Sequence, residues 1–118
     1  MTIVLPWPPK DLSPNARIHW SKLAKAKKAY RTECFMQSRI AGYTSQSFPA
    51  GSKLAVSLVF YPPDKRHRDQ DNMLAAMKSG MDGIADCLGI DDRHFKTTFD
   101  VAESIGGMVK VTIAEVRP

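Results

Sequence analysis

Carboxylates are concentrated in one short stretch of this chain, and their spacing is suited to metal chemistry. They fall in three groups: Asp69-Gln70-Asp71-Asn72, then Asp82 and Asp86, then Asp91-Asp92. Magnesium takes oxygen ligands, usually one or two protein carboxylates together with waters and substrate phosphates, so an Asp-x-Asp pair with distant acids suits it. Because the chain carries a formal net charge of +5, we interpret these acids as a candidate cation site that faces a polyanion.

A purely structural explanation competes with the metal site. An Asp at a helix start caps the first amides, and acids in the first turn interact well with the helix dipole, which would account for Asp69 or Asp71. Capping does not account for Asp91-Asp92, which follows the same predicted helix at the end where the dipole disfavours negative charge. Residue types alone leave both explanations open.

Length and composition predict a single basic domain over residues 1–118. A chain of 118 residues with 43% hydrophobic residues is long enough for one core, and its excess of positive charge is typical of nucleic-acid partners, although it can also serve solubility. Cys34 and Cys87 lack metal-site spacing and lie in apolar patterns, so we expect reduced thiols in a cytoplasmic protein. No signal peptide or long apolar run is found, and we expect no membrane partner.

Hydrophobic patterns predict an α+β domain in the order β-α-β-α-β-β, with two helices packed on a small mixed or antiparallel sheet. The expected strands span residues 2–5, 54–61, 95–102 and 108–116, and the last two are expected to form a hairpin across Gly106-Gly107. The expected helices run from an N-cap at Ser21 to about Ile40, and from Asp69–Asp71 to Gly89. The first should turn Leu23, Ala26, Tyr30, Cys34 and Ile40 inward, and the second Leu74, Met77, Met81, Ile84, Ala85 and Leu88.

Helical geometry places a lysine near the acids. At ~100° per residue, Asp71, Lys78 and Asp82 fall within about 20° of one line on a continuous helix. Lys78 could therefore stabilise a phosphate next to a metal bound at Asp71. The simpler alternative is a surface ion pair between Lys78 and Asp82, which contributes a few tenths of a kcal/mol.

Basic residues gather in two places suited to phosphate contacts. A stripe runs along the first helix, and a second cluster directly precedes the first acidic pair. Cations beside an acidic pair fit a site where phosphate is held against bound metal, whereas a solvated helix face also explains the stripe. The candidate DNA-binding residues are Arg17, Lys22, Lys25, Lys28 and Arg31 in the stripe, and Lys65, Arg66 and Arg68 in the cluster.

The order of these motifs resembles the RusA family of Holliday-junction resolvases. The matching pieces are Leu5-Pro6-Trp7-Pro8-Pro9, Ser13-Pro14-Asn15, Arg66-His67-Arg68-Asp69-Gln70-Asp71-Asn72, Lys78, Asp82 and Asp91-Asp92. The resemblance implies an intertwined homodimer that resolves four-way DNA junctions with Mg²⁺, an endodeoxyribonuclease of DNA recombination and repair. It implies metal ligands at Asp69, Asp71 and Asp92, with Asp91 the alternative to Asp92. Lys78 takes the place of the family's catalytic lysine, which in some members lies where this chain has Ala75.

The residues also limit the chemistry without the resemblance. No Ser-His-Asp or Cys-His arrangement offers a covalent route, and an EF-hand is excluded because Met73 falls on a ligand position. Carboxylate-held magnesium could activate water and neutralise a scissile phosphate. The alternatives are a non-catalytic basic DNA-binding module and a metal nuclease that acts on other branched DNA.

Helix length predicts that one site is shared between two chains. A helix over residues 72–88 is ~25 Å long, so Asp92 starts from the end opposite Asp69 and Asp71. Only a connection that doubled back after Gly89 would bring them together in one chain. We therefore expect Asp92 of one subunit to complete the site at Asp71 of the other, in a twofold-symmetric dimer.

Overall fold

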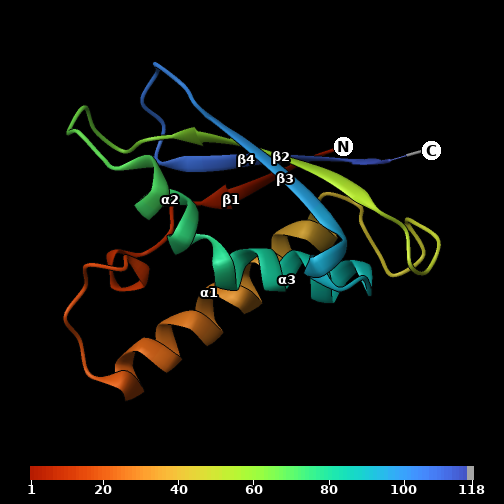
Figure 1. The fold of residues 1–118 in the computed structure, drawn as a ribbon, viewed down its shortest axis with the longest axis horizontal. Coiled ribbons are helices and arrows are strands. Elements are labelled where there is room, and N and C mark those ends of the chain that lie inside the picture. The colour runs from red at the N-terminus through yellow and green to blue at the C-terminus, as the bar shows by residue number, and fades with distance from the viewer. Residues whose placement is uncertain (117–118) are drawn as a thin grey trace.

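The computed structural model describes residues 1–116 as one α+β domain. The described elements are β1 (Thr2–Pro6), η1 (Lys10–Leu12), α1 (Trp20–Ile40), β2 (Leu54–Tyr61), α2 (Gln70–Ala76), α3 (Lys78–Leu88), η2 (Asp92–His94), β3 (Phe95–Val101) and β4 (Met108–Glu115). The helices gather on one face of the sheet (Figure 1). No helix in this part of the chain is both long enough and apolar enough to cross a membrane.

The sheet has four strands in the order β1-β4-β2-β3 and is mixed. β4 is antiparallel to both β1 and β2, whereas β3 runs parallel to β2. A parallel pair needs a long crossover connection, and α2 and α3 supply it between β2 and β3. The second helical segment is therefore fixed across the sheet face, with its start near the end of β2 and its end near the start of β3.

The expected hairpin between residues 95–102 and 108–116 is wrong. β2 lies between β3 and β4, so these strands do not pair although they are adjacent in sequence. The connection instead crosses the end of β2, where Gly107 donates a backbone hydrogen bond to Tyr61 (2.7 Å) and Gly106 donates one to Pro62 (2.9 Å). Turn residues thus mark a chain reversal, but the register of β4 is decided by two neighbours, β1 and β2.

Strand β2 supplies the centre of the core. Leu54, Val56, Leu58 and Phe60 alternate toward the helices and are all 1% exposed or less. Such strict alternation is expected of a strand with one fully covered face. Val109 and Val111 of β4 are equally buried. The buried face of β2 is therefore the one that carries these alternating apolar side chains.

Helix α1 begins at Trp20, one residue before the predicted cap. His19 is the observed N-cap, and its side chain accepts a hydrogen bond from the Ser21 amide at 3.2 Å. Of the residues predicted to point inward, Tyr30 and Cys34 are buried, and Leu23 and Ala26 are partly covered. Ile40 is 72% exposed, so its assignment to the core is wrong: it is the last residue of α1.

The helix predicted from Asp69–Asp71 to Gly89 is interrupted at Met77. The Met77 amide donates to Leu74 (3.1 Å), a tighter turn than an α-helix makes, and the chain restarts as α3 at Lys78. Met77 is fully buried, and the interruption lets the chain change direction over the core. The predicted alignment of Asp71 with Lys78 assumed one continuous helix, so that alignment loses its basis.

Glycines allow α3 to approach α1 closely. A Cβ at Gly83 would lie 2.2 Å from the Arg31 carbonyl oxygen, and a Cβ at Gly80 would lie 2.7 Å from the Tyr30 ring. Neither distance is compatible with a methyl group unless atoms move. The contact at Gly83 is with backbone, which cannot turn aside as a side chain can.

We predict that Gly83→Ala destabilises the domain by about 3 kcal/mol, as overpacking does. Alanine forms helices better than glycine by up to about 1 kcal/mol. A loss of stability in Gly83→Ala would therefore come from the steric clash. Gly80→Ala is the matched variant and should cost less, because it meets only side-chain atoms. Urea unfolding of both variants measures this, and a Gly83→Ala protein as stable as the wild type would contradict the close approach.

Candidate functional site

The first acidic pair opens helix α2. Asp69 is the N-cap, and its Oδ1 accepts hydrogen bonds from the amides of Asp71 (2.8 Å) and Asn72 (3.3 Å). The capping explanation therefore holds for Asp69, although a carboxylate has a second oxygen. Asp71 lies in the first turn and is exposed. Helix α2 thus presents two neighbouring carboxylates to solvent, one of them with an oxygen already engaged.

The second acidic pair divides into two roles. Asp91 caps η2, where its side chain accepts from the Arg93 amide at 2.9 Å. Asp92 instead contacts Lys78, whose ammonium also donates to Asp82 at 3.0 Å. Of the two, Asp92 is the carboxylate directed toward the helix.

Lys78 lies between two acids at the start of α3. Hydrogen bonding to Asp92 and then Asp82 raises its pKa, and Lys78 in turn lowers the pKa of Asp92. The predicted pair of Lys78 with Asp82 is therefore present, and Asp92 enlarges the pair into a network. The Lys78 charge is engaged by its own chain.

The chain after Gly89 folds back on α3, which the prediction of a site shared between two chains assumed that it would not do. Gly89 adopts a left-handed conformation with φ 66°, and the Ile90 amide donates to Ala85 at 3.3 Å. This turn brings Asp92 back to Lys78, fourteen residues earlier in sequence. Asp92 therefore lies near the start of α3, although it follows the end of that helix in sequence.

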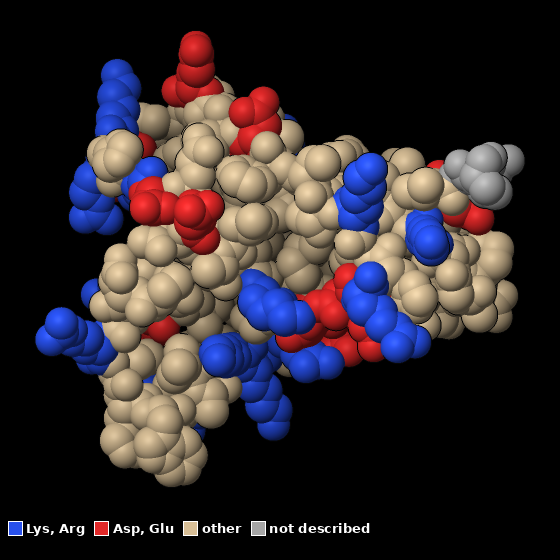
Figure 2. All heavy atoms as spheres, viewed as in Figure 1, with Lys and Arg blue, Asp and Glu red and all other residues tan. Residues whose placement is uncertain are grey.

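The three predicted metal ligands nevertheless do not converge within this chain. Among residues 1–116, no three His, Cys, Asp or Glu side chains are placed where they could hold a metal ion. Figure 2 shows the acids on this face as separate groups, one near α2 and another over α3 and η2, with basic side chains around the second. The structure places Asp92 beside Lys78 and Asp82, and leaves Asp69 and Asp71 apart from them.

The basic stripe on α1 is not uniform. Arg31 makes a two-pronged ion pair with Asp86, at 2.6 Å from Nε and 2.8 Å from its terminal nitrogen, which raises its pKa. Lys22 lies 4.0 Å from Asp11. Within residues 1–116, Lys25 and Lys28 have no carboxylate within 4.0 Å. Arg31 thus joins α1 to α3, and the remaining exposed cations are the better candidates for a polyanion.

The basic cluster before α2 contains one cation held in place. Arg68 pairs with Asp64 at 2.9 Å and lies over the Trp7 ring at 5.5 Å, which orders the loop against the N-terminal segment. The guanidinium also lowers the pKa of Asp64. Lys65 and Arg66 are exposed. Arg17 is exposed too, in the loop before α1.

A cleft of about 620 Å³ adjoins Asp69 of the acidic pair. Its lining includes Trp7, Asn15, Arg66, Asp69 and Asn72, from the N-terminal loop, the basic cluster and α2. Three of the pieces that carried the family resemblance, those around Trp7, Asn15 and Asp69, therefore meet in space, whereas the pieces at Lys78, Asp82 and Asp92 do not line this cleft. The sequence predicted no role for Trp7 and Asn15 beyond their place in the motifs. The tertiary fold brings both into the cleft beside Asp69.

Comparison with known proteins shows a similar protein over nearly the whole chain. No family model matches the chain. A protein of Xylella fastidiosa strain Temecula1, described as an uncharacterized protein, is 44% identical over 117 residues, which cover 98% of this chain and 76% of the relative. The chain belongs to the same family as that Xylella protein.

We predict that Asp86→Asn destabilises the protein by about 0.5–1 kcal/mol at neutral pH, since the pair is partly exposed and screened. Arg31 lowers the pKa of Asp86 below its ordinary value. The stabilisation is therefore present above about pH 4 and is lost as pH falls through the lowered pKa of the folded state.

Urea unfolding at neutral and acidic pH tests this, with Glu103→Gln, an exposed loop substitution, as the control. The difference between wild type and Asp86→Asn should shrink in acid. A difference that stayed constant with pH would show that the variant acts through something other than the ion pair.

Proposed function

We propose that this protein is a magnesium-dependent endodeoxyribonuclease that resolves four-way DNA junctions by paired, symmetric strand cleavage. The observation that carries the proposal is the exposed Asp69–Asp71 pair at the start of α2, beside a cleft lined by basic and motif residues. The order of these motifs along the chain resembles the RusA family, which adds the substrate class. A cytoplasmic location accords with this role.

The residues at α2 suit magnesium by their chemistry. Asp71 and the second oxygen of Asp69 are hard, exposed donors from one helical turn, and magnesium commonly takes one or two carboxylates and completes its shell with water and phosphate. Asp92 is the third proposed ligand. When bound, magnesium would activate water and neutralise charge on the scissile phosphate.

The remaining roles fall to the protein's own cations. Lys65 and Arg66 border the acids and would position the strand through its phosphates. Lys78 would stabilise charge on the reacting phosphate, a role that strengthens in the transition state. Because Lys78 is engaged by Asp82 and Asp92, a phosphate would have to take the place of one of these carboxylates at its ammonium.

A non-catalytic DNA-binding module is the main rival, because Asp69 does cap a helix. A nuclease for other branched DNA is the second. Purified protein with magnesium and end-labelled junction, flap and duplex separates all three. Paired symmetric nicks in the junction alone support the proposal, flap cleavage favours the second rival, and binding without cleavage favours the first.

We predict that Asp71→Asn lowers junction cleavage at least about 100-fold, in the range seen when one essential charge is removed from an active site. Junction affinity should hold or improve, because negative charge near phosphates is removed. Asp100→Asn, an exposed substitution on β3, is the control and should cleave normally. Cleavage by Asp71→Asn at the wild-type rate would refute the metal site.

We further propose that a second subunit completes each site, because the three acids do not gather among the described residues of one chain. A four-way junction has approximate twofold symmetry, which a twofold dimer would match. In this arrangement Asp92 of one subunit would bind metal together with Asp69 and Asp71 of the other.

A heterodimer of Asp71→Asn and Asp92→Asn subunits tests the shared site. Sharing leaves one site intact and the other doubly broken, so the heterodimer should nick one strand of the junction. Both mutant homodimers, the matched controls, should be inactive. If verified heterodimers were also inactive, each site would have to lie within one chain.

A further inference from the structure

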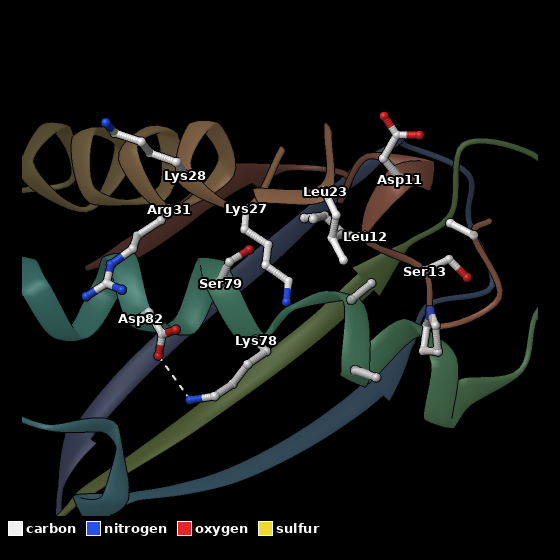
Figure 3. A pocket seen from close by; sticks show the side chains of 14 residues that line it. Asp11, Leu12, Ser13, Leu23, Lys27, Lys28, Arg31, Lys78, Ser79 and Asp82 are labelled. Atoms are coloured by element: carbon white, nitrogen blue, oxygen red, sulfur yellow. Dashed lines mark hydrogen bonds and ion pairs between the residues drawn. The ribbon is translucent and has the colours of Figure 1, made fainter. Parts of the chain in front are cut away.

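A second cleft lies between α1, η1 and the junction of α2 with α3 (Figure 3). It measures about 540 Å³ and is lined by more cations than acids. The charged residues around it are Lys27, Lys28, Arg31, Lys78, Asp11 and Asp82. The proposed catalytic acids Asp69, Asp71 and Asp92 do not line it.

One lysine supplies uncommitted positive charge inside this cleft. Arg31 is paired with Asp86, and Lys78 with Asp82 and Asp92. Lys27 has no carboxylate within 4.0 Å in the described part of the chain. Figure 3 shows its side chain extending from α1 into the space before α3, whereas Lys28 points away.

A buried hydroxyl lines the same cleft without a partner. Ser79 is 8% exposed, and over residues 1–116 its Oγ is the only buried side-chain nitrogen or oxygen that makes no hydrogen bond. Buried polar groups are nearly always hydrogen-bonded, so an unpaired one indicates a missing partner. In Figure 3 the Ser79 side chain lies on the side of α3 that faces Lys27.

The start of α3 adds further donors. Met77 precedes the helix without a side-chain cap, and the first amides of a helix have no partner within it. The dipole of this eleven-residue helix also favours an anion there. An ammonium, a hydroxyl and a helix start therefore meet around one space, and all three donate to an anion.

The two clefts adjoin each other. Ser13 and Ala76 line both the cleft at Ser79 and the cleft beside Asp69. An extended chain of phosphates could therefore occupy both at once, whereas a single free anion would use only one. This continuity favours a strand over an isolated phosphate compound.

We propose that the cleft at Ser79 binds a phosphate group of a nucleic-acid strand through Lys27, the Ser79 hydroxyl and the start of α3. The strand as the source of the phosphate rests on the proposed function. The site would hold the strand at a fixed point beside the acidic pair, and so set which phosphodiester reaches it.

Inorganic phosphate is the first probe. In an NMR titration against chloride at equal ionic strength, the Ser79 and Gly80 amide resonances should shift with phosphate. Ser79→Ala should bind phosphate about tenfold more weakly, the loss expected for one hydrogen bond to a charged group. The control Ser45→Ala, at an exposed serine past α1, should bind normally.

Stability separates this loss from unfolding. Because the Ser79 hydroxyl is unpaired in the free protein, Ser79→Ala should keep or raise the melting temperature without phosphate. A folded Ser79→Ala protein that binds phosphate like the wild type would overturn the site. Phosphate shifts spread over the lysines but absent at Ser79 and Gly80 would overturn it too.

Junction DNA is the second probe. Lys27→Gln should lower the slope of log affinity against log salt by roughly 0.9, one phosphate contact. Ser79→Ala should weaken binding about tenfold with the slope unchanged, and Lys53→Gln, at an exposed lysine before β2, should change neither. A mononucleotide that binds as tightly as an oligonucleotide would overturn the strand as the ligand.

The two proposals fail separately. If the wild type cuts no junction but phosphate still moves the Ser79 and Gly80 resonances, the nuclease assignment fails and the phosphate site stands. If junctions are cut normally by Ser79→Ala and by Lys27→Gln with unchanged affinity, the phosphate site fails and the nuclease assignment stands.

Discussion

The close contact between α1 and α3 at Gly83 holds the helical layer together. With backbone of one helix against a glycine of the other, α3 is held at a separation that side chains would not permit. That separation lets Arg31 reach Asp86 and buries Tyr30, whose hydroxyl donates to the Pro6 carbonyl at 2.7 Å. One close approach thus fixes α1 to both α3 and β1. It also places Cys34 in the core, where burial raises the pKa of its thiol to about 12 and keeps it protonated.

The interruption at Met77 is the second organising feature. It separates the carboxylates of α2 from the ion-pair network of α3, and it creates an uncapped helix start between them. The clefts on either side share Ser13 and Ala76. A continuous helix would bury this region in its own hydrogen bonds and leave no donors for a ligand. The break therefore divides one amphipathic segment into two helices, with a cleft beside each.

The acids of this chain have different physical roles, although they look alike in sequence. Asp69 and Asp91 cap helices, Asp86 joins two helices, and Asp92 binds a lysine. Within the described residues, the side chain of Asp71 neither caps a helix nor pairs with a cation. In the proposed metal site, Asp71 is therefore the most available carboxylate, and Asp69 has one oxygen engaged as a cap. An ion bound there would compete with Lys78 only for Asp92.

Local patterns in the sequence predicted the strands, most of the helical residues and the Lys78–Asp82 pair, because these depend on local periodicity and on residues one helical turn apart. The sequence also marked Asp69 as either cap or ligand. The position of β2 between β3 and β4 could not be read from the sequence. Strand order depends on which strands pair along the two edges of β2, and these pairings are made between segments far apart in the chain. Tertiary structure likewise decided the break at Met77 and the return of Asp92 to Lys78. Those features follow from how closely helices pack over the sheet, and spacing along the chain carries no information about that distance.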